Sequence, residues 1–133
     1  MESNLSRYQP QVLSILRIMA GLLFLSAGLQ KWFGIPVANP SYAKITLLSM
    51  VGIAGVIEII GGALVTVGLY TRAAAFIMSG EMAAAYFLSH APRGFFPILN
   101  NGDSAILYCF IFLYFAFAGP GPWSLDALWR KRA

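Results

Sequence analysis

Four long apolar runs follow one another along the chain, separated by residues that interrupt helices. They cover about residues 12–33, 46–69, 72–90 and 104–118. Within each run the apolar residues are continuous and do not alternate with polar ones, which argues against the strands of a membrane barrel. Because backbone polar groups in hydrocarbon must be paired within their own segment, such runs predict helices that span a bilayer of roughly 30 Å. The pattern therefore predicts an all-α, four-helix transmembrane bundle that forms a single domain over residues 1–133.

The segments between the runs predict how the helices connect. Glycine and proline end the first run at residues 34–36 and the fourth run at residues 119–122. The second and third runs adjoin at residues 70–72, so they are expected to form a tight antiparallel hairpin. The tail, residues 123–133, combines apolar positions with three terminal bases. It predicts a short interfacial helix capped by Ser124.

The connection between the third and fourth runs is rich in aromatic and turn-forming residues, which predicts an ordered interfacial loop. It includes Asn100, Asn101 and Asp103, which are expected to form a turn and to cap the fourth helix. His90 is interpreted as a residue of this loop. Its distance from Glu81 along the chain is not the three or four residues typical of two metal ligands on one helix.

The composition also indicates that lipid is the solvent. Of the 133 residues, 59% are hydrophobic and 11% are charged, and the mean hydropathy is +0.72, which is too apolar for an ordinary soluble domain. The net charge of +4 does not indicate nucleic acid, because the bases lie at the ends of the runs, with one cluster at residues 130–132. That distribution is typical of contact with anionic lipid headgroups. The single cysteine, Cys109, excludes a disulfide or a CxxC pair within one chain, and no metal site is predicted.

The same bases predict the orientation in the membrane. With four spans both termini share a side. The bases on that side are Arg7, Arg72 and residues 130–132, and those opposite are Lys31, Lys44 and Arg93. The positive-inside rule then places both termini in the cytoplasm. A cleaved signal peptide is disfavoured for the first run, because the run is long and Arg17 interrupts it.

Two acidic residues lie in the middle of apolar runs, Glu58 in the second and Glu81 in the third. An ionised, unpaired carboxylate there is energetically unfavourable, so both side chains are expected to face the bundle interior. Small residues one turn before and after Glu58 allow another helix to approach on that face: Ala54, Gly55, Gly61 and Gly62. Because the two runs form a hairpin and the acids share a depth, they are expected to line one cavity.

A basic residue of the first run, Arg17, is expected to reach toward these acids. It lies on one helical stripe with Gly21, Gly28 and Lys31. One base that serves two acids would leave one proton on the acid pair. Glu58, Glu81 and Arg17 are therefore predicted to form a proton-handling polar site beside a quinone or another amphipathic ligand. The alternative is that these buried charges only fix the helix register.

Four further residues are secondary candidates for the polar site: Lys31, Tyr86, His90 and Tyr108. The two tyrosine hydroxyls could hydrogen-bond within it, although aromatic residues in membrane spans more often pack or lie at the interface. No covalently bound cofactor is indicated.

Several stretches of the chain resemble the DoxX family. Residues 58–72, with Glu58, Gly61, Gly62 and Arg72, are similar to the family's second-helix signature. Residues 81–97 and 119–126, and the first helix with Arg17 and Lys31, are similar to a common bacterial branch of that family. The resemblance implies a four-helix protein of the bacterial inner (cytoplasmic) membrane. Named members are membrane subunits of thiosulfate:quinone oxidoreductase or of an oxidoreductase complex linked to oxidative stress.

The leading hypothesis is a small membrane subunit that anchors or couples a partner oxidoreductase and contacts quinone at the buried Glu/Arg site. The chain lacks a CxxC motif and a haem-ligand pair, so it is not expected to be catalytic alone. Two alternatives stay open: a small proton-coupled transporter that acts as an oligomer, and a purely structural accessory subunit of a larger membrane complex. The expected partners are the lipid bilayer and either another protein or further copies of the chain.

Overall fold

A computed structural model of the chain describes residues 2–35, 37 and 46–132. All regular elements within these residues are helical, which confirms the all-α prediction. A π-helical turn at Tyr86–His90 and a short 3-10 turn at Ala91–Arg93 continue α4. The α-helices are α1 (Glu2–Ser6), α2 (Gln9–Phe33), α3 (Met50–Val67), α4 (Thr71–Ala85), α5 (Pro97–Asn100), α6 (Asp103–Ala118) and α7 (Leu125–Arg132).

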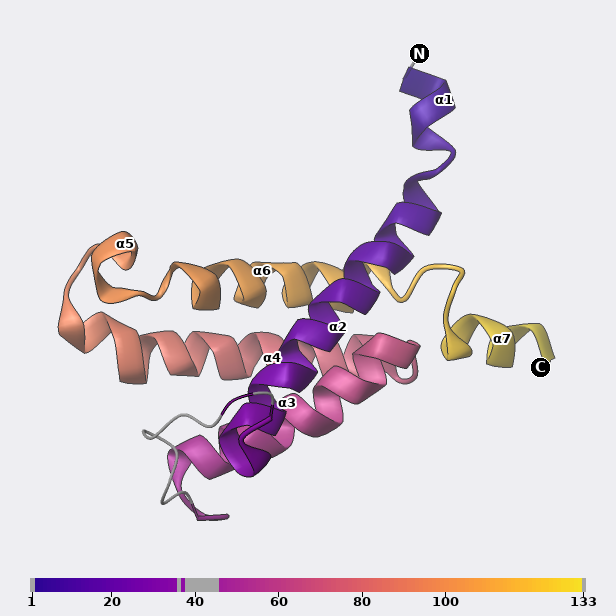
Figure 1. The fold of residues 1–133 in the computed structure, drawn as a ribbon. Helices are drawn as coiled ribbons and strands as arrows, with labels where there is room; N and C mark the ends of the chain where they lie inside the picture. Colours follow the sequence, from indigo (N-terminus) through magenta and orange to yellow (C-terminus); the bar gives the residue numbers. More distant parts are fainter. Residues whose placement is uncertain (1, 36, 38–45, 133) are drawn as a thin grey trace.

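The long helices are arranged as two pairs. Helix α2 packs along α3, and α4 packs along α6, while the contact between α3 and α4 is smaller. In Figure 1 the α2–α3 pair crosses the α4–α6 pair at an angle. The α3–α4 turn and α7 lie at one end of the molecule, and α5 lies at the opposite end (Figure 1). The predicted hairpin of the second and third runs is thus present as α3 and α4, joined at residues 68–70.

Local sequence explains where the two most apolar helices begin and end. Pro10 lies in the first turn of α2, where its missing N–H is not needed, and Gly34 ends α2 in the left-handed conformation at a φ of 67°. Helix α3 begins after Ser49, whose hydroxyl accepts a hydrogen bond from Gly52 N at 3.0 Å. It ends at Gly68, with a φ of 75°. The second run was predicted to begin at residue 46, but this cap starts the helix four residues later, at Met50.

Two of the described helices are long and apolar enough to cross a membrane. They are α2, with 25 residues, and α3, with 18 residues, each with a mean hydropathy of 2.1. Helix α6 is apolar but has only 16 residues, and α4 has 15. The spanning of the membrane by all four helices therefore stays a prediction.

Glycines bring the backbones of α2 and α3 into direct contact. A Cβ atom on Gly28 would lie 2.8 Å from the carbonyl oxygen of Gly55, and a Cβ atom on Gly62 would lie 2.7 Å from Leu25 N. Neither position has room for a larger residue. The small residues around Glu58 thus permit the close approach of another helix, as their spacing predicts.

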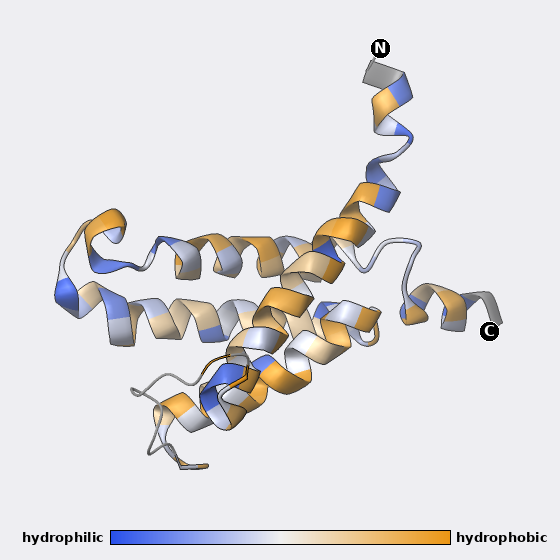
Figure 2. Cartoon of the chain, viewed as in Figure 1, coloured by the Kyte–Doolittle hydropathy of each residue, from blue (hydrophilic) through white to orange (hydrophobic). Residues whose placement is uncertain are grey.

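The outer sides of the helices are apolar. Large apolar residues appear in orange in Figure 2 along α2, α3 and α6. Exposed examples on the four long helices are Leu23, Ile60, Phe76, Phe110 and Phe117. The buried core is small by comparison and centres on Phe24, Met78, Phe112 and Phe115. An apolar exterior of this extent needs lipid or another protein to cover it.

The predicted caps have different outcomes. Ser124 caps α7 as predicted, since its hydroxyl accepts a hydrogen bond from Ala127 N at 3.1 Å. The prediction that Asn100, Asn101 and Asp103 cap the fourth helix is wrong in position, because the residue before α6 is Gly102, which has no side chain. Asp103 is the first residue of α6, and its carboxylate accepts a hydrogen bond only from the adjacent Ser104 N, at 3.1 Å. Asn100 and Asn101 form the turn instead: the Asn100 side chain accepts a hydrogen bond from Gly102 N, and Asn101 takes a φ of 60°.

Candidate functional site

A buried ion pair joins α2 to α3. The ammonium group of Lys31 donates a hydrogen bond to Oε1 of Glu58 at 2.7 Å. The Glu58 side chain is only 3% exposed and that of Lys31 is 17% exposed. Both residues come three positions after a contact glycine, Gly28 in α2 and Gly55 in α3. The close backbone contact at these glycines brings the two charged side chains within reach of each other.

The second buried acid, Glu81, lies against Glu58. Its carboxyl group in α4 is close enough to that of Glu58 for direct electrostatic interaction. Both of its carboxyl oxygens are buried, and neither makes a hydrogen bond of ordinary geometry with any described residue. We call Lys31, Glu58 and Glu81 the acid cluster. The structure thus brings the two predicted acids together, with Lys31 as the base beside them.

The acid cluster contains one cation and two acids. With both acids ionised it would carry a net negative charge in an apolar interior, which is strongly unfavourable. A proton on Glu81 makes the cluster neutral and turns one oxygen of Glu81 into a hydrogen-bond donor. One proton shared by the two acids therefore balances the charge of Lys31.

The prediction that Arg17 serves these acids is wrong. The Arg17 side chain, 1% exposed, binds backbone carbonyls at the end of α3 and in the segment after α6. Nε donates to Val65 O at 2.9 Å, Nη2 donates to Trp123 O at 2.7 Å, and Nη1 donates to Pro120 O. Arg17 and Lys31 are 14 residues apart on α2, or about 21 Å along its axis. The register of the α2–α3 pair therefore places Lys31 beside Glu58, and Arg17 beside the last turn of α3.

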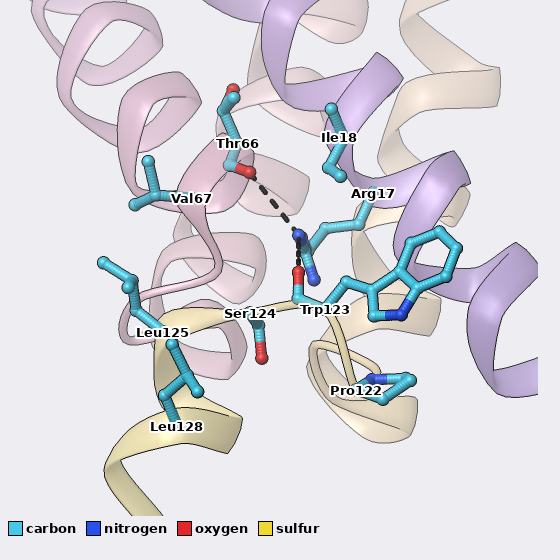
Figure 3. Close-up of a pocket in the computed structure, with 9 residues that line it drawn as sticks. All are labelled: Arg17, Ile18, Thr66, Val67, Pro122, Trp123, Ser124, Leu125 and Leu128. Carbon is cyan, nitrogen blue, oxygen red and sulfur yellow. Dashed lines mark hydrogen bonds between the residues drawn. The ribbon is translucent and has the colours of Figure 1, made fainter.

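A groove of about 470 Å³ opens beside Arg17. Its walls are mostly apolar and include Ile18 and Val67 from the helices and Trp123, Leu125 and Leu128 from the C-terminal segment. Figure 3 shows the Arg17 guanidinium between the backbone oxygens of Thr66 and Trp123 at the edge of this groove. Since the guanidinium already bonds these carbonyls, its main role in the structure is to hold the C-terminal segment against α2 and α3.

Comparison with known proteins assigns the chain to a family. The model of the DoxX family matches residues 12–91, which is more than half of the chain. The chain belongs to the DoxX family. It is 44% identical over 133 residues to an uncharacterized protein of Haemophilus influenzae, a match that covers 98% of this chain and 99% of that protein. It is 35% identical over 140 residues to the uncharacterized membrane protein Rv3486 of Mycobacterium tuberculosis, covering 93% and 84% of the two chains. No solved structure shows a significant match.

The matched region of this DoxX protein contains Arg17 and the whole acid cluster. It ends at residue 91, before the segment that Arg17 binds. The membrane character of the family agrees with the apolar exterior of the helices.

The other secondary candidates of this DoxX protein lie outside the acid cluster in two separate groups. His90 Nδ1 is 3.1 Å from the carbonyl oxygen of Asn100, and the Asn100 side chain donates to the hydroxyl of Tyr86 at 3.3 Å. This group lies near α5, at the end of the molecule opposite α7 (Figure 1). Tyr108 belongs to the aromatic core, where its ring centroid is 5.5 Å from that of Phe24. No group of three possible metal-ligating side chains occurs within the described residues.

Sequence reasoning missed one important residue of the C-terminal segment, Asp126. Its two carboxylate oxygens accept hydrogen bonds from Tyr70 N at 2.9 Å and from Thr71 N at 3.0 Å, at the beginning of α4. Its own N–H donates to Gly68 O at 2.9 Å. Asp126 is more than 50 residues from these partners, so no local pattern could have revealed the contact. The contact ties α7 to the α3–α4 turn.

Proposed function

We propose that this DoxX protein is an integral membrane subunit whose acid cluster holds one exchangeable proton for a partner oxidoreductase. The single observation that carries the proposal is the carboxyl group of Glu81, which is buried against the paired Glu58 and makes no hydrogen bond of ordinary geometry within the described residues. A structural acid would be expected to have a partner for each buried oxygen. An acid that exchanges a proton must instead exist in both a protonated and an ionised state, and its surroundings favour only one of them.

The charge balance of the acid cluster explains why proton exchange would be coupled to another process. Release of the Glu81 proton leaves two carboxylates beside the single ammonium group of Lys31. The resulting negative charge is unfavourable in a low dielectric until a cation arrives or an electron leaves nearby. Oxidation of a reduced quinone releases protons and electrons together, so a quinone-linked oxidoreductase is a suitable partner for such a site.

We place the bilayer around α2, α3, α4 with its π-helical continuation, and α6. The hydropathy of α2 and α3 and the exposed apolar side chains support this arrangement. Both termini would face the cytoplasm of a bacterial inner membrane. Lys31 is paired with Glu58 inside the protein, so it is left out of the bases on the side of the membrane opposite the termini. That leaves Arg7, Arg72 and Arg130 among the bases at the end with the termini, which supports the orientation.

For the quinone contact that the family resemblance implies, the groove beside Arg17 is the best candidate. Its volume of about 470 Å³ is in the usual range for small-molecule sites, and its walls are mostly apolar. The indole of Trp123 offers a flat surface for a ring. The acid cluster lies about two turns of α3 away, so proton and electron sites would be separate.

The substitution Glu81→Gln tests the proton site, because glutamine has the shape of a protonated glutamate and cannot release a proton. We expect the variant to fold and to insert into membranes like the parent protein. Infrared spectra of the purified protein should lose the C=O band of a buried protonated carboxyl group. Asp103→Asn, at an exposed position at the start of α6, is the matched control and should leave this band unchanged. If the Glu81→Gln spectrum keeps the band, the proton is not on Glu81 and the proposal is wrong.

Copurification tests the partner. The tagged parent protein and the Glu81→Gln variant should retain the same partner from native membranes. Only the parent protein should support the partner's quinone-dependent turnover. A variant with full turnover would instead favour the purely structural role of the buried charges.

A proton-coupled transporter that acts as an oligomer is the second candidate function. One observation favours it: the outer face of α4 carries small exposed residues, Ala73, Gly80 and Ala84. A Cβ atom on Gly80 would meet nothing within 4 Å, so another helix could approach closely there. Crosslinking between copies through cysteine at position 80 would support this candidate, and its failure in native membranes would argue against it.

A further inference from the structure

We propose that the groove between Arg72 and Arg130 binds the headgroup of one anionic phospholipid. The groove has a volume of about 390 Å³ and lies where α2 begins, α4 begins and α6 ends, with α7 as its remaining wall. Both arginines line it, together with Leu13, Tyr114 and Pro120. The inference rests on the membrane placement proposed above and is independent of the acid cluster.

Arg72 is held in place by the end of α6. Its Nη1 atom donates hydrogen bonds to the carbonyl oxygens of Ala116, at 3.1 Å, and Phe117, at 2.6 Å. A Cβ atom on Gly119 would lie 2.9 Å from Nη2 of Arg72, so this glycine leaves space for the guanidinium. The Nε and Nη2 atoms have no hydrogen-bond acceptor among the described residues. These remaining donors are available to a phosphate oxygen.

Arg130 is brought to the groove by the contact of Asp126 with α4. Asp126 binds the backbone N–H groups of Tyr70 and Thr71, the two residues before Arg72. Since Arg130 is one helical turn after Asp126, it lies on the same side of α7. Both carboxylate oxygens of Asp126 accept backbone hydrogen bonds, and neither arginine makes an ion pair with an acid in the part of the chain that the structure describes. Two cations therefore line the groove, and neither forms an ion pair with an acid among the described residues.

The remainder of the groove suits the apolar part of a lipid. Leu13 and Tyr114 lie on α2 and α6, whose outer surfaces would face acyl chains in the proposed placement. The groove itself is at the ends of the helices, which is the depth of the headgroups. A lipid phosphate between the two arginines would have its glycerol and acyl chains along this apolar wall. Free phosphate would gain nothing from that wall, so the occupant is assigned as a phospholipid with a net negative charge.

Lipid retention by the full-length protein tests the site. The protein is purified in a mild detergent, incubated with phosphatidylglycerol or phosphatidylcholine, and analysed by native mass spectrometry for bound lipid. We expect the parent protein to retain phosphatidylglycerol in preference to phosphatidylcholine. Arg130→Gln should weaken the binding of phosphatidylglycerol about fivefold, the effect expected for loss of one basic side chain near an anionic lipid. Arg130→Lys, which keeps the charge, should restore most of it.

Arg93→Gln is the matched control, because Arg93 is an exposed arginine near α5, at the opposite end of the molecule. The Arg93→Gln variant should keep the parent protein's preference for phosphatidylglycerol over phosphatidylcholine. Equal retention of the two lipids by the parent protein, or equal losses in Arg93→Gln and Arg130→Gln, would overturn the proposed lipid site and leave the acid cluster unaffected. Release of the protein from membranes without detergent would instead refute the membrane placement itself.

Discussion

Replacement of Lys31 by methionine tests the energetics of the acid cluster most directly. The Nζ–Oε1 distance of 2.7 Å corresponds to an attraction of about 6 kcal/mol at an effective dielectric constant of roughly 20. Desolvation of the two charges offsets part of this attraction. Removal of one member of a buried ion pair, however, leaves the other charge without its partner, at a cost of about 3–5 kcal/mol. Because Lys31 is 17% exposed, we expect Lys31→Met to destabilise the protein by about 3 kcal/mol, the lower end of that range.

A double-mutant cycle separates the ion pair from other effects of the substitution. Unfolding of Lys31→Met, Glu58→Gln and the double variant is followed in detergent micelles by circular dichroism, with increasing fractions of a denaturing detergent. Each single variant should lose about 3 kcal/mol of unfolding free energy. The loss in the double variant should be smaller than the sum of the two single losses by at least about 2 kcal/mol. Arg93→Met, at an exposed position, should change stability by less than about 0.5 kcal/mol. Strictly additive losses for Lys31 and Glu58 would refute the assignment of a stabilising buried pair.

Three other substitutions test the surrounding structure. Asp126→Ala should destabilise the protein by about 1–2 kcal/mol, because it removes the carboxylate that binds the first N–H groups of α4. Asp103→Ala should have a smaller effect, and thermal unfolding in micelles compares the two variants. Gly28→Ala should separate α2 from α3 and lower the unfolding midpoint, while Gly80→Ala should be neutral or stabilising, so equal effects would contradict the packing. Asn100→Ala should cost about 1–3 kcal/mol and speed hydrogen exchange at Gly102 N, because it removes the nearer of that group's two acceptors and leaves only Pro97 O at 3.2 Å; unchanged exchange would contradict this role.

The sequence alone was sufficient for the four long helices and for the expectation that the two buried acids lie together. Continuous apolar runs can satisfy their backbone only as helices, so their number and approximate positions follow from composition and spacing. The short connection at residues 68–70 makes α3 and α4 neighbours, and nearly equal distances of Glu58 and Glu81 from it give both acids a similar depth. These inferences use only local spacing and one short turn.

The choice of base and the role of the tail required the tertiary structure. Arg17 and Lys31 lie on the same stripe of α2, and only the register of α2 against α3, fixed where glycine backbones touch, decides which of them meets Glu58. The contacts of Arg17 and Asp126 join segments about 50 to 105 residues apart. Periodicity predicts which face of a helix is buried, but it carries no information on how far one helix slides along another. That offset is set by packing between distant segments, and it separates Arg17 from the acid cluster.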